Sequence, residues 1–221
     1  MTSQRATTVS TRRVVAVVCA VAAVSLCAGA GSSAAAPVII PAKSPVVLQG
    51  GTRHAHRVFV IGDSITVITA DDLAKVLRPH WRYEIDGWSG ITIAGQLSTI
   101  DDELATVPSQ DWVVELGTND VWQQLSATIE QFANEVGTLA DQPCVILVTV
   151  TPRLDTVDLD GWMLWVSRSF PNFHLLDWGT QEYSNPAWVR SDRVHPTPAG
   201  AVVLADDEVQ ALDADCPSAP R

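Results

Sequence analysis

A regular alternation of strand-like and helix-like segments constrains this chain more than any other feature of its sequence. Short runs of apolar and β-branched residues are each followed by a longer segment whose apolar residues recur every three or four positions. The strand-like runs cover residues 57–61, 81–85, 112–116, 145–150 and 174–176, and the helical segments cover residues 65–77, 92–107, 126–140, 158–170 and 198–212. This alternation predicts an α/β sandwich with a mostly parallel five-stranded sheet.

Polar motifs follow the strands of this predicted sheet. Gly62-Asp63-Ser64 comes after the first strand, Ser89-Gly90 after the second and Gly117-Thr118-Asn119-Asp120 after the third. Asp192-Arg193-Val194-His195 lies after the fifth strand, directly before the last helix. Ligands of such sheets bind beyond the carboxyl ends of the strands. We therefore expect the four motifs to meet at one edge of the sheet.

The residue types in these motifs suit nucleophilic catalysis. A serine hydroxyl is a weak nucleophile that needs a base within hydrogen-bond reach, and the base needs an orienting partner. Ser64, His195 and Asp192 are the candidates for these three roles. The backbone N–H groups of Ser64 and Gly90 and the side-chain amide of Asn119 are candidate donors to an oxyanion. Each motif alone also has a structural interpretation, as a turn, a helix cap or a surface histidine.

Taken together, the four motifs resemble those of the SGNH, or GDSL, family of serine esterases and acyltransferases, and the likeness runs from Val58 to Leu212. The resemblance implies a flavodoxin-like three-layer sandwich with strand order 2-1-3-4-5. It implies Ser64 as nucleophile, Asp192 and His195 as the rest of a triad, and Gly90 and Asn119 in the oxyanion hole. It also implies no metal and no other cofactor.

A narrower likeness concerns the segments 113–119, 148–153, 176–178 and 195–200. They resemble the extracellular SGNH domains attached to acyltransferase-3 membrane proteins, which move acyl groups onto cell-wall or other surface sugars. The resulting hypothesis is a secreted carboxylic-ester hydrolase of the esterase or acetylesterase type, with acylated glycans as candidate substrates. The alternatives are an O-acyltransferase acting on cell-surface sugars and a non-catalytic glycan-binding module.

The tryptophans divide into two predicted groups. Trp88, Trp122 and Trp188 adjoin the motifs and are candidates to line a substrate site, although each can instead pack under its own loop. The core is expected to contain Trp112, Trp165 and Trp178.

The N-terminal region reads as a targeting segment. Residues 1–36 combine three arginines with an apolar run over residues 14–30 and a small-residue cleavage site, which predicts a signal peptide. An uncleaved anchor is the alternative. Residues 37–56 contain prolines and a Gly pair and are assigned to a flexible linker, 57–213 to the SGNH domain and 214–221 to a C-terminal tail. We expect a secreted or cell-envelope protein with no stable membrane insertion after cleavage.

Charge and cysteine content add two expectations. The chain has 25 acidic and 14 basic residues and a net charge of −11, which argues against nucleic acid as a partner. Cys144 begins the fourth strand and Cys216 follows the last helix, so both lie at the sheet edge opposite the motifs. This placement predicts a disulfide in an oxidising compartment, two unrelated thiols being the alternative.

Overall fold

The computed structural model describes residues 45–51, 56–120, 123–150 and 157–216. The predicted signal peptide, most of the predicted linker and Trp122 lie outside these residues. Within the described ranges, every helix is too short or too polar to cross a membrane.

A six-stranded sheet with strand order β1-β3-β2-β4-β5-β6 forms the middle layer. The strands are β1 (Val46–Gly51), β2 (Arg57–Gly62), β3 (Arg82–Gly87), β4 (Asp111–Glu115), β5 (Cys144–Val148) and β6 (Phe173–Leu176). All neighbouring pairs from β3 to β6 are parallel, whereas β1 is antiparallel to β3. Strands β2 to β6 therefore have the order 2-1-3-4-5 implied by the resemblance, which is confirmed, but the predicted count of five strands is wrong because β1 adds a sixth at the edge.

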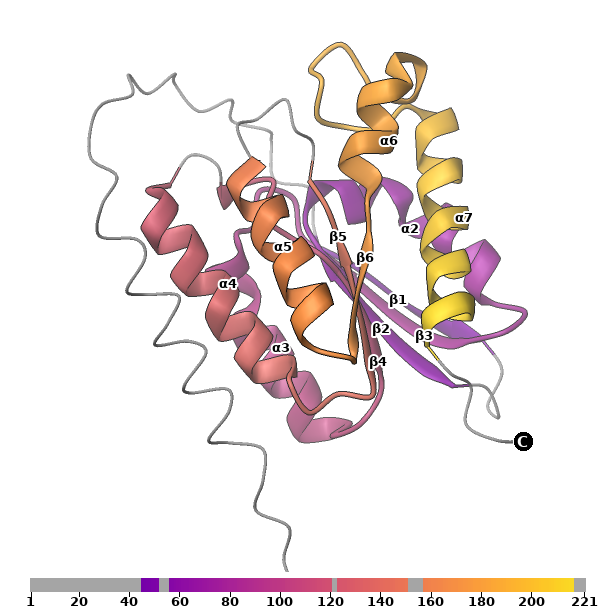
Figure 1. Ribbon diagram of the computed structural model, residues 1–221. Coiled ribbons are helices and arrows are strands. Elements are labelled where there is room, and N and C mark those ends of the chain that lie inside the picture. The colour runs from indigo at the N-terminus through magenta and orange to yellow at the C-terminus, as the bar shows by residue number, and fades with distance from the viewer. Residues whose placement is uncertain (1–44, 52–55, 121–122, 151–156, 217–221) are drawn as a thin grey trace, which may run out of the picture.

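Helices cover both faces of the sheet (Figure 1). One face carries α2 (Ser64–Leu77) and α7 (Pro198–Asp215), and the other carries α3 (Ile93–Thr106), α4 (Leu125–Leu139) and α5 (Val157–Ser169). Along β2, Val58 and Val60 point into the first core, whereas Phe59 and Ile61 point into the second. A strand that is apolar on both faces requires such two-sided cover, and the predicted three-layer sandwich is confirmed.

Strand β1 corrects the assignment of residues 37–56 to a flexible linker. Residues 46–51 pair with β3 in an unbroken register from Val46↔Gly87 to Gly51↔Arg82. Val46 and Leu48 pack against the core, whereas the alternate residues Val47 and Gln49 are exposed. This period-two pattern is short, and the glycines at its end make it look like a linker in the sequence. Gly51 has a φ of +88°, where a side chain would collide with the Trp81 carbonyl oxygen.

Three further details differ from the sequence-based expectations. A short helix, α6 (Trp178–Ser184), and a 3-10 turn, η4 (Pro186–Trp188), follow β6. Helix α7 continues to Asp215, past the predicted domain end at residue 213. Trp165 is 39% exposed on the outer side of α5 and was wrongly expected in the core, whereas Trp112 and Trp178 are buried as expected.

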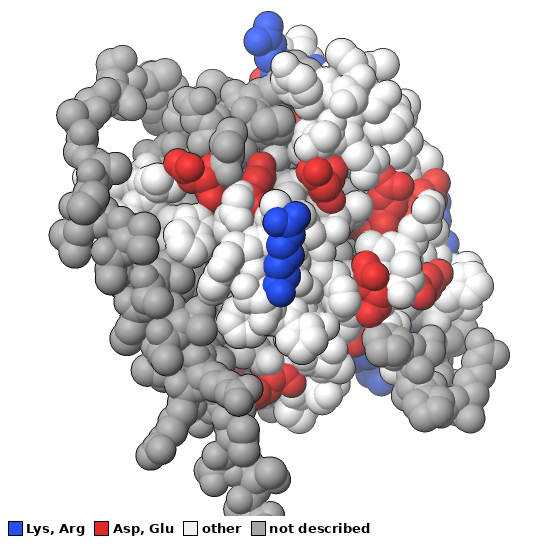
Figure 2. All heavy atoms as spheres, viewed as in Figure 1, with Lys and Arg blue, Asp and Glu red and all other residues white. Residues whose placement is uncertain are grey.

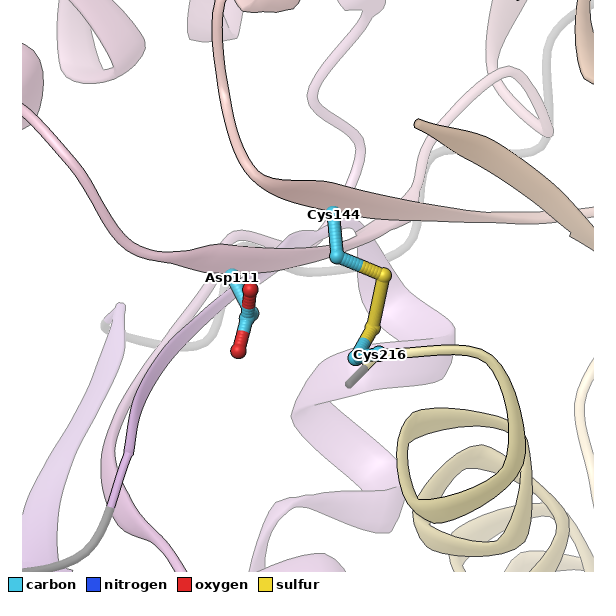
Figure 3. A group of neighbouring side chains, drawn as sticks. All are labelled: Asp111, Cys144 and Cys216. Atoms are coloured by element: carbon cyan, nitrogen blue, oxygen red, sulfur yellow. A yellow bond between two sulfur atoms is a disulfide. The ribbon is translucent and has the colours of Figure 1, made fainter. Parts of the chain in front are cut away.

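A disulfide joins Cys144 to Cys216, with their Cα atoms 5.4 Å apart, which confirms the predicted bond. It ties the start of β5 to the residue that follows α7. Figure 3 shows the carboxyl group of Asp111, on β4, beside the two sulfur atoms. In this oxidised form the sulfur atoms bond to each other.

Charged side chains are spread over the surface. On the face shown in Figure 2, the Lys and Arg side chains of the described residues stand apart from one another, between acidic groups.

Candidate active site

Ser64 lies at the carboxyl end of β2, where the strand turns into α2. Gly62 ends the strand, Asp63 is the N-cap and Ser64 is the first helical residue. The Asp63 carboxylate accepts a hydrogen bond from the Ile65 N–H (2.9 Å), which fixes the first helical turn. Because the first N–H groups of a helix lack intrahelical partners, this turn presents backbone donors beside the Ser64 hydroxyl.

A chain of hydrogen-bonding groups connects Ser64 to two residues of the loop before α7. Ser64 Oγ lies 2.9 Å from His195 Nε2. The other ring nitrogen, Nδ1, lies 3.0 Å from Asp192 Oδ2. Ser64 is 131 positions from His195 in the sequence, so the fold brings together the three residues that the motifs single out. The two contacts have the connectivity that a serine nucleophile, its base and an orienting carboxylate require.

The loop from Asp192 to His195 holds its own carboxylate in place. The Asp192 Oδ1 atom accepts hydrogen bonds from the backbone N–H groups of Val194 and His195, both 3.0 Å long. Arg193, which lies between Asp192 and Val194, has a φ of 64°, which bends the backbone so that both N–H groups face the carboxylate. Burial alone would raise the pKa of Asp192, but these bonds and the His195 ring lower it below its ordinary value. Asp192 thus stays ionised beside the imidazole.

Backbone hydrogen bonds also hold the loop that contains Asp192 and His195. The N–H of Arg190 donates to the His195 carbonyl (2.8 Å), and the N–H of Thr197 donates to the Trp188 carbonyl (2.7 Å). Thr197 caps α7 through a bond from the Gly200 N–H, with Pro198 as the first helical residue. This cap sets the direction in which the chain passes from His195 into α7.

The predicted oxyanion donors lie on neighbouring loops. Gly90 has a φ of 80°, and a Cβ atom placed there would meet nothing within 4 Å, so its backbone is open to approach. The Trp88 N–H donates to the Gly62 carbonyl (3.1 Å) and holds this loop beside the end of β2. The Asn119 amide donates to the Ile91 carbonyl (2.9 Å) and to Asp63 Oδ2 (3.2 Å). Asn119 thus links three loops, and its role towards an oxyanion stays a prediction.

Asp120 bonds to the first turn of α3, a helix that precedes it in the chain and whose N-cap is Thr92. Its Oδ2 atom accepts a bond from the Ile93 N–H (3.0 Å), and burial raises its pKa to about 6. The alternative interpretation of this motif, in which it stabilises a helix end, therefore applies to Asp120, but the helix concerned is α3 and not α4, which follows it.

Buried carboxyl groups behind Ser64 are the feature that sequence reasoning missed. Asp63, Glu115 and Glu208 are each 2% exposed or less. Burial raises the pKa of Asp63 to about 7, against the lowering effect of hydrogen bonds from Ile65 and Thr118. A signal was present in the sequence: Glu115 directly follows the apolar residues 112–114 of β4, and Glu208 occupies a position at helical spacing from the buried Leu204 and Leu212 of α7.

The tryptophans expected to line a substrate site have different surroundings. Trp88 is 41% exposed, next to the Ser89-Gly90 turn. Trp188 stacks on Trp178 with ring centroids 5.9 Å apart and an interplanar angle of 6°, so that ring covers one of its faces. Trp122 lies outside the described residues. Trp88 is therefore the described tryptophan of this group with the most accessible ring.

Comparisons with known proteins were made by sequence and by structure. No family model matches the chain. The chain is 26% identical over 160 residues to a curated protein of Bacillus subtilis (strain 168) named "Putative peptidoglycan O-acetyltransferase YrhL". The match includes 72% of this chain and 24% of that protein, so this chain spans about a quarter of the length of its curated relative.

Solved structures with a similar fold include three enzymes or enzyme domains. The C-terminal catalytic domain of peptidoglycan O-acetyltransferase A from Streptococcus pneumoniae has a TM-score of 0.61 at 19% identity, covering 76% of this chain and 99% of that one. A member of the lipolytic protein G-D-S-L family from Veillonella parvula also reaches 0.61, at 17% identity, with 72% and 100% covered. The acetylxylan esterase Axe2 from Geobacillus stearothermophilus reaches 0.52 at 22% identity, with 73% and 94% covered. These likenesses confirm the resemblance carried by the motifs: this chain has the fold of the SGNH, or GDSL, hydrolases.

Proposed function

We propose that this protein is a secreted acyl-ester hydrolase in which Ser64, His195 and Asp192 form a catalytic triad. The observation that carries the proposal is the continuous set of contacts from Ser64 Oγ through the His195 ring to Asp192, at 2.9 and 3.0 Å. The likeness to acetylxylan esterase and to lipolytic proteins supports an ester as the substrate. Acylated glycans are the substrate class we favour.

The geometry suggests how each group acts. In the tautomer with hydrogen on Nδ1, the Nε2 atom of His195 takes the Ser64 proton as Oγ attacks the ester carbonyl carbon. Asp192 stabilises the imidazolium that forms. The imidazolium then protonates the leaving alcohol, which leaves an acyl group on Ser64. Water attacks this acyl-enzyme with His195 again as base, the carboxylic acid departs, and Ser64 recovers its proton.

The negative oxygen of the tetrahedral intermediates needs donors close to Ser64. We assign this role to the backbone N–H groups of Ser64 and Gly90 and to the Asn119 amide. The open space around Gly90 supports its assignment. For Asn119 the assignment requires that the oxyanion share or replace one of the two acceptors that the amide contacts in the free protein, Asp63 Oδ2 or the Ile91 carbonyl.

Hydrolysis of short-chain p-nitrophenyl esters tests the proposal. Ser64→Ala is expected to lower kcat by at least about 10³-fold, and Asp192→Asn by a comparable factor, because each breaks the proton-transfer chain. Ser98→Ala, which alters an exposed serine on α3, is the matched control and should behave like the unaltered protein. Undiminished turnover in the Ser64→Ala protein with an intact fold would refute the mechanism.

Acyl transfer is the second candidate function, and it rests on the O-acetyltransferase names of two similar proteins. A sugar hydroxyl would then replace water in the second half of the reaction. Incubation with an acyl donor and an oligosaccharide acceptor separates the two, since a transferase yields acylated oligosaccharide and a hydrolase yields only free acid. A glycan-binding module without activity would bind the oligosaccharide but resist labelling of Ser64 by a fluorophosphonate probe.

A further inference from the structure

Glu115 contacts the chain on both sides of Ser64. Its backbone carbonyl accepts a hydrogen bond from the Asp63 N–H (3.2 Å), one residue before Ser64. Its side chain accepts a hydrogen bond from the Thr66 hydroxyl, two residues after Ser64. Glu115 is 2% exposed and Thr66 is fully buried. One residue of β4 therefore holds the segment that carries the proposed nucleophile at two points.

The atoms around Gly62 are closely packed. A Cβ atom on Gly62 would lie 1.8 Å from the Thr66 hydroxyl oxygen and 2.9 Å from the Glu115 carbonyl oxygen. Either distance is too short for non-bonded atoms, so only glycine fits between the end of β2 and the first turn of α2. The Thr66 hydroxyl, which the Glu115 side chain holds, is thus packed directly against the backbone that leads into Ser64.

The charges of three other acidic residues also act on the Glu115 carboxyl. They are Glu208 on α7, Glu182 on α6 and Asp63 at the start of α2. Helices α2 and α7 pack against each other on one face of the sheet (Figure 1), and α7 begins three residues after His195. Glu115 and Glu208 are thus placed between the helix that carries Ser64 and the helix that follows His195.

Burial of these two carboxyl groups favours their protonated forms. Burial, and next the charge of Glu208, raise the pKa of Glu115 well above its ordinary value, although the Thr66 bond lowers it. Burial, with Asp207 beside it, raises the pKa of Glu208 to about 8. A buried carboxyl without a compensating cation takes up a proton in this way. Ionising both would place two negative charges between α2 and α7.

We propose that Glu115 is a positioning residue: its hydrogen bonds with the Asp63 N–H and the Thr66 hydroxyl hold the first turn of α2 so that Ser64 Oγ stays within hydrogen-bond reach of His195. The inference rests on the proposed function of Ser64. It assigns Glu115 no contact with substrate. When Glu115 and Glu208 are both ionised at alkaline pH, their repulsion separates α2 from α7 and lengthens the Ser64–His195 contact, so kcat falls while KM changes little.

Matched substitutions test the positioning role. Glu115→Gln keeps an acceptor for Thr66 and cannot ionise, so we expect it to retain kcat at pH 7 within about threefold. Glu115→Leu and Thr66→Val each remove the bond between the two side chains, and we expect both to lower kcat at least tenfold at unchanged KM. The proposal is overturned if Glu115→Gln loses as much activity as Glu115→Leu, or if the Leu variant keeps full kcat.

The dependence of kcat on pH distinguishes the positioning role of Glu115 from a merely structural role, which would leave this dependence unchanged. We expect the activity of the unaltered protein to fall above about pH 8, and the Glu115→Gln/Glu208→Gln double variant to keep its activity there. If kcat falls over the same alkaline pH range in both proteins, the repulsion argument is contradicted.

A readout independent of turnover separates this inference from the proposed function. Carbon-13 NMR of labelled glutamate carboxyls, assigned with the two Gln variants, should show a pKa of about 8 for Glu208 and a pKa well above the ordinary value for Glu115. Amide hydrogen exchange in the first turn of α2 should be faster in Glu115→Leu than in the unaltered protein. Titration of Glu115 near its ordinary pKa of 4.5 would overturn the inference even if Ser64 proves to be the nucleophile, and both results can be obtained if the protein has no esterase activity.

Discussion

Replacing both cysteines by alanine should destabilise the protein through its unfolded state. The bond between Cys144 and Cys216 spans 72 residues, and cross-linking a loop of that length costs the unfolded chain entropy worth about 4 kcal/mol at 25 °C. Both cysteines are nearly fully buried, so deleting two sulfur atoms adds roughly 1 kcal/mol of lost packing. We expect the Cys144→Ala/Cys216→Ala variant to unfold with a free energy lower by about 5 kcal/mol.

Urea denaturation followed by tryptophan fluorescence measures this loss. With a slope of about 2 kcal/mol per molar urea, the midpoint should move down by roughly 2.5 M. The unaltered protein in the presence of a dithiol reductant is the control, and it should lose the entropic share of about 4 kcal/mol. Activity on a neutral ester should be retained below the transition, because the disulfide lies at the sheet edge opposite Ser64. A loss below 1 kcal/mol in both proteins would show that the loop-entropy reasoning does not apply.

Two further substitutions test the packing and the buried charges. Gly62→Ala forces a Cβ atom into the Thr66 hydroxyl, so kcat should fall at least tenfold and the unfolding free energy by about 1–3 kcal/mol. The control is Gly161→Ala, where a Cβ atom meets nothing within 4 Å. Equal effects of the two substitutions would refute the packing argument. Burial raises the pKa of Glu135 from 4.5 to about 8, so between these two pH values the folded state binds a proton at Glu135 that the unfolded state has lost. The free energy of unfolding therefore falls as the pH rises from 4.5 to about 8, by up to about 1.4 kcal/mol per pH unit. Glu135→Gln should remove that slope between pH 5 and 8 in urea titrations and the exposed Glu130→Gln should not; identical slopes in all three proteins would contradict the burial argument.

The parts of the site that follow strands were predictable from the sequence. Two motifs can be recognised in the sequence because each combines turn-forming residues with reactive side chains: Gly62-Asp63-Ser64 and Asp192 to His195. The parallel sheet then brings both motifs to one edge. The disulfide followed from the same argument, since strands and helices of known direction place Cys144 and Cys216 at the opposite edge.

Contacts that depend on three-dimensional packing were not predictable in this way. The bond between Thr66 and Glu115 joins residues 49 positions apart, and neither residue type at its position signals the other. Trp165 was expected in the core on the strength of its hydrophobicity, yet α5 turns it outward while the same helix buries Met163 and Val166. Single residues of a helix with a weak apolar stripe cannot be placed by composition alone.

Strand β1 has a consequence for where the folded unit begins. It covers the outer side of β3, whose backbone N–H and C=O groups would otherwise be unpaired over the six residues of the register. An uncovered strand edge is a template on which a second chain can add a strand. A recombinant fragment that started at Arg57, the boundary suggested by the linker-like composition, would carry such an edge and tend to self-associate. A recombinant folded unit should therefore include Val46 and the rest of β1.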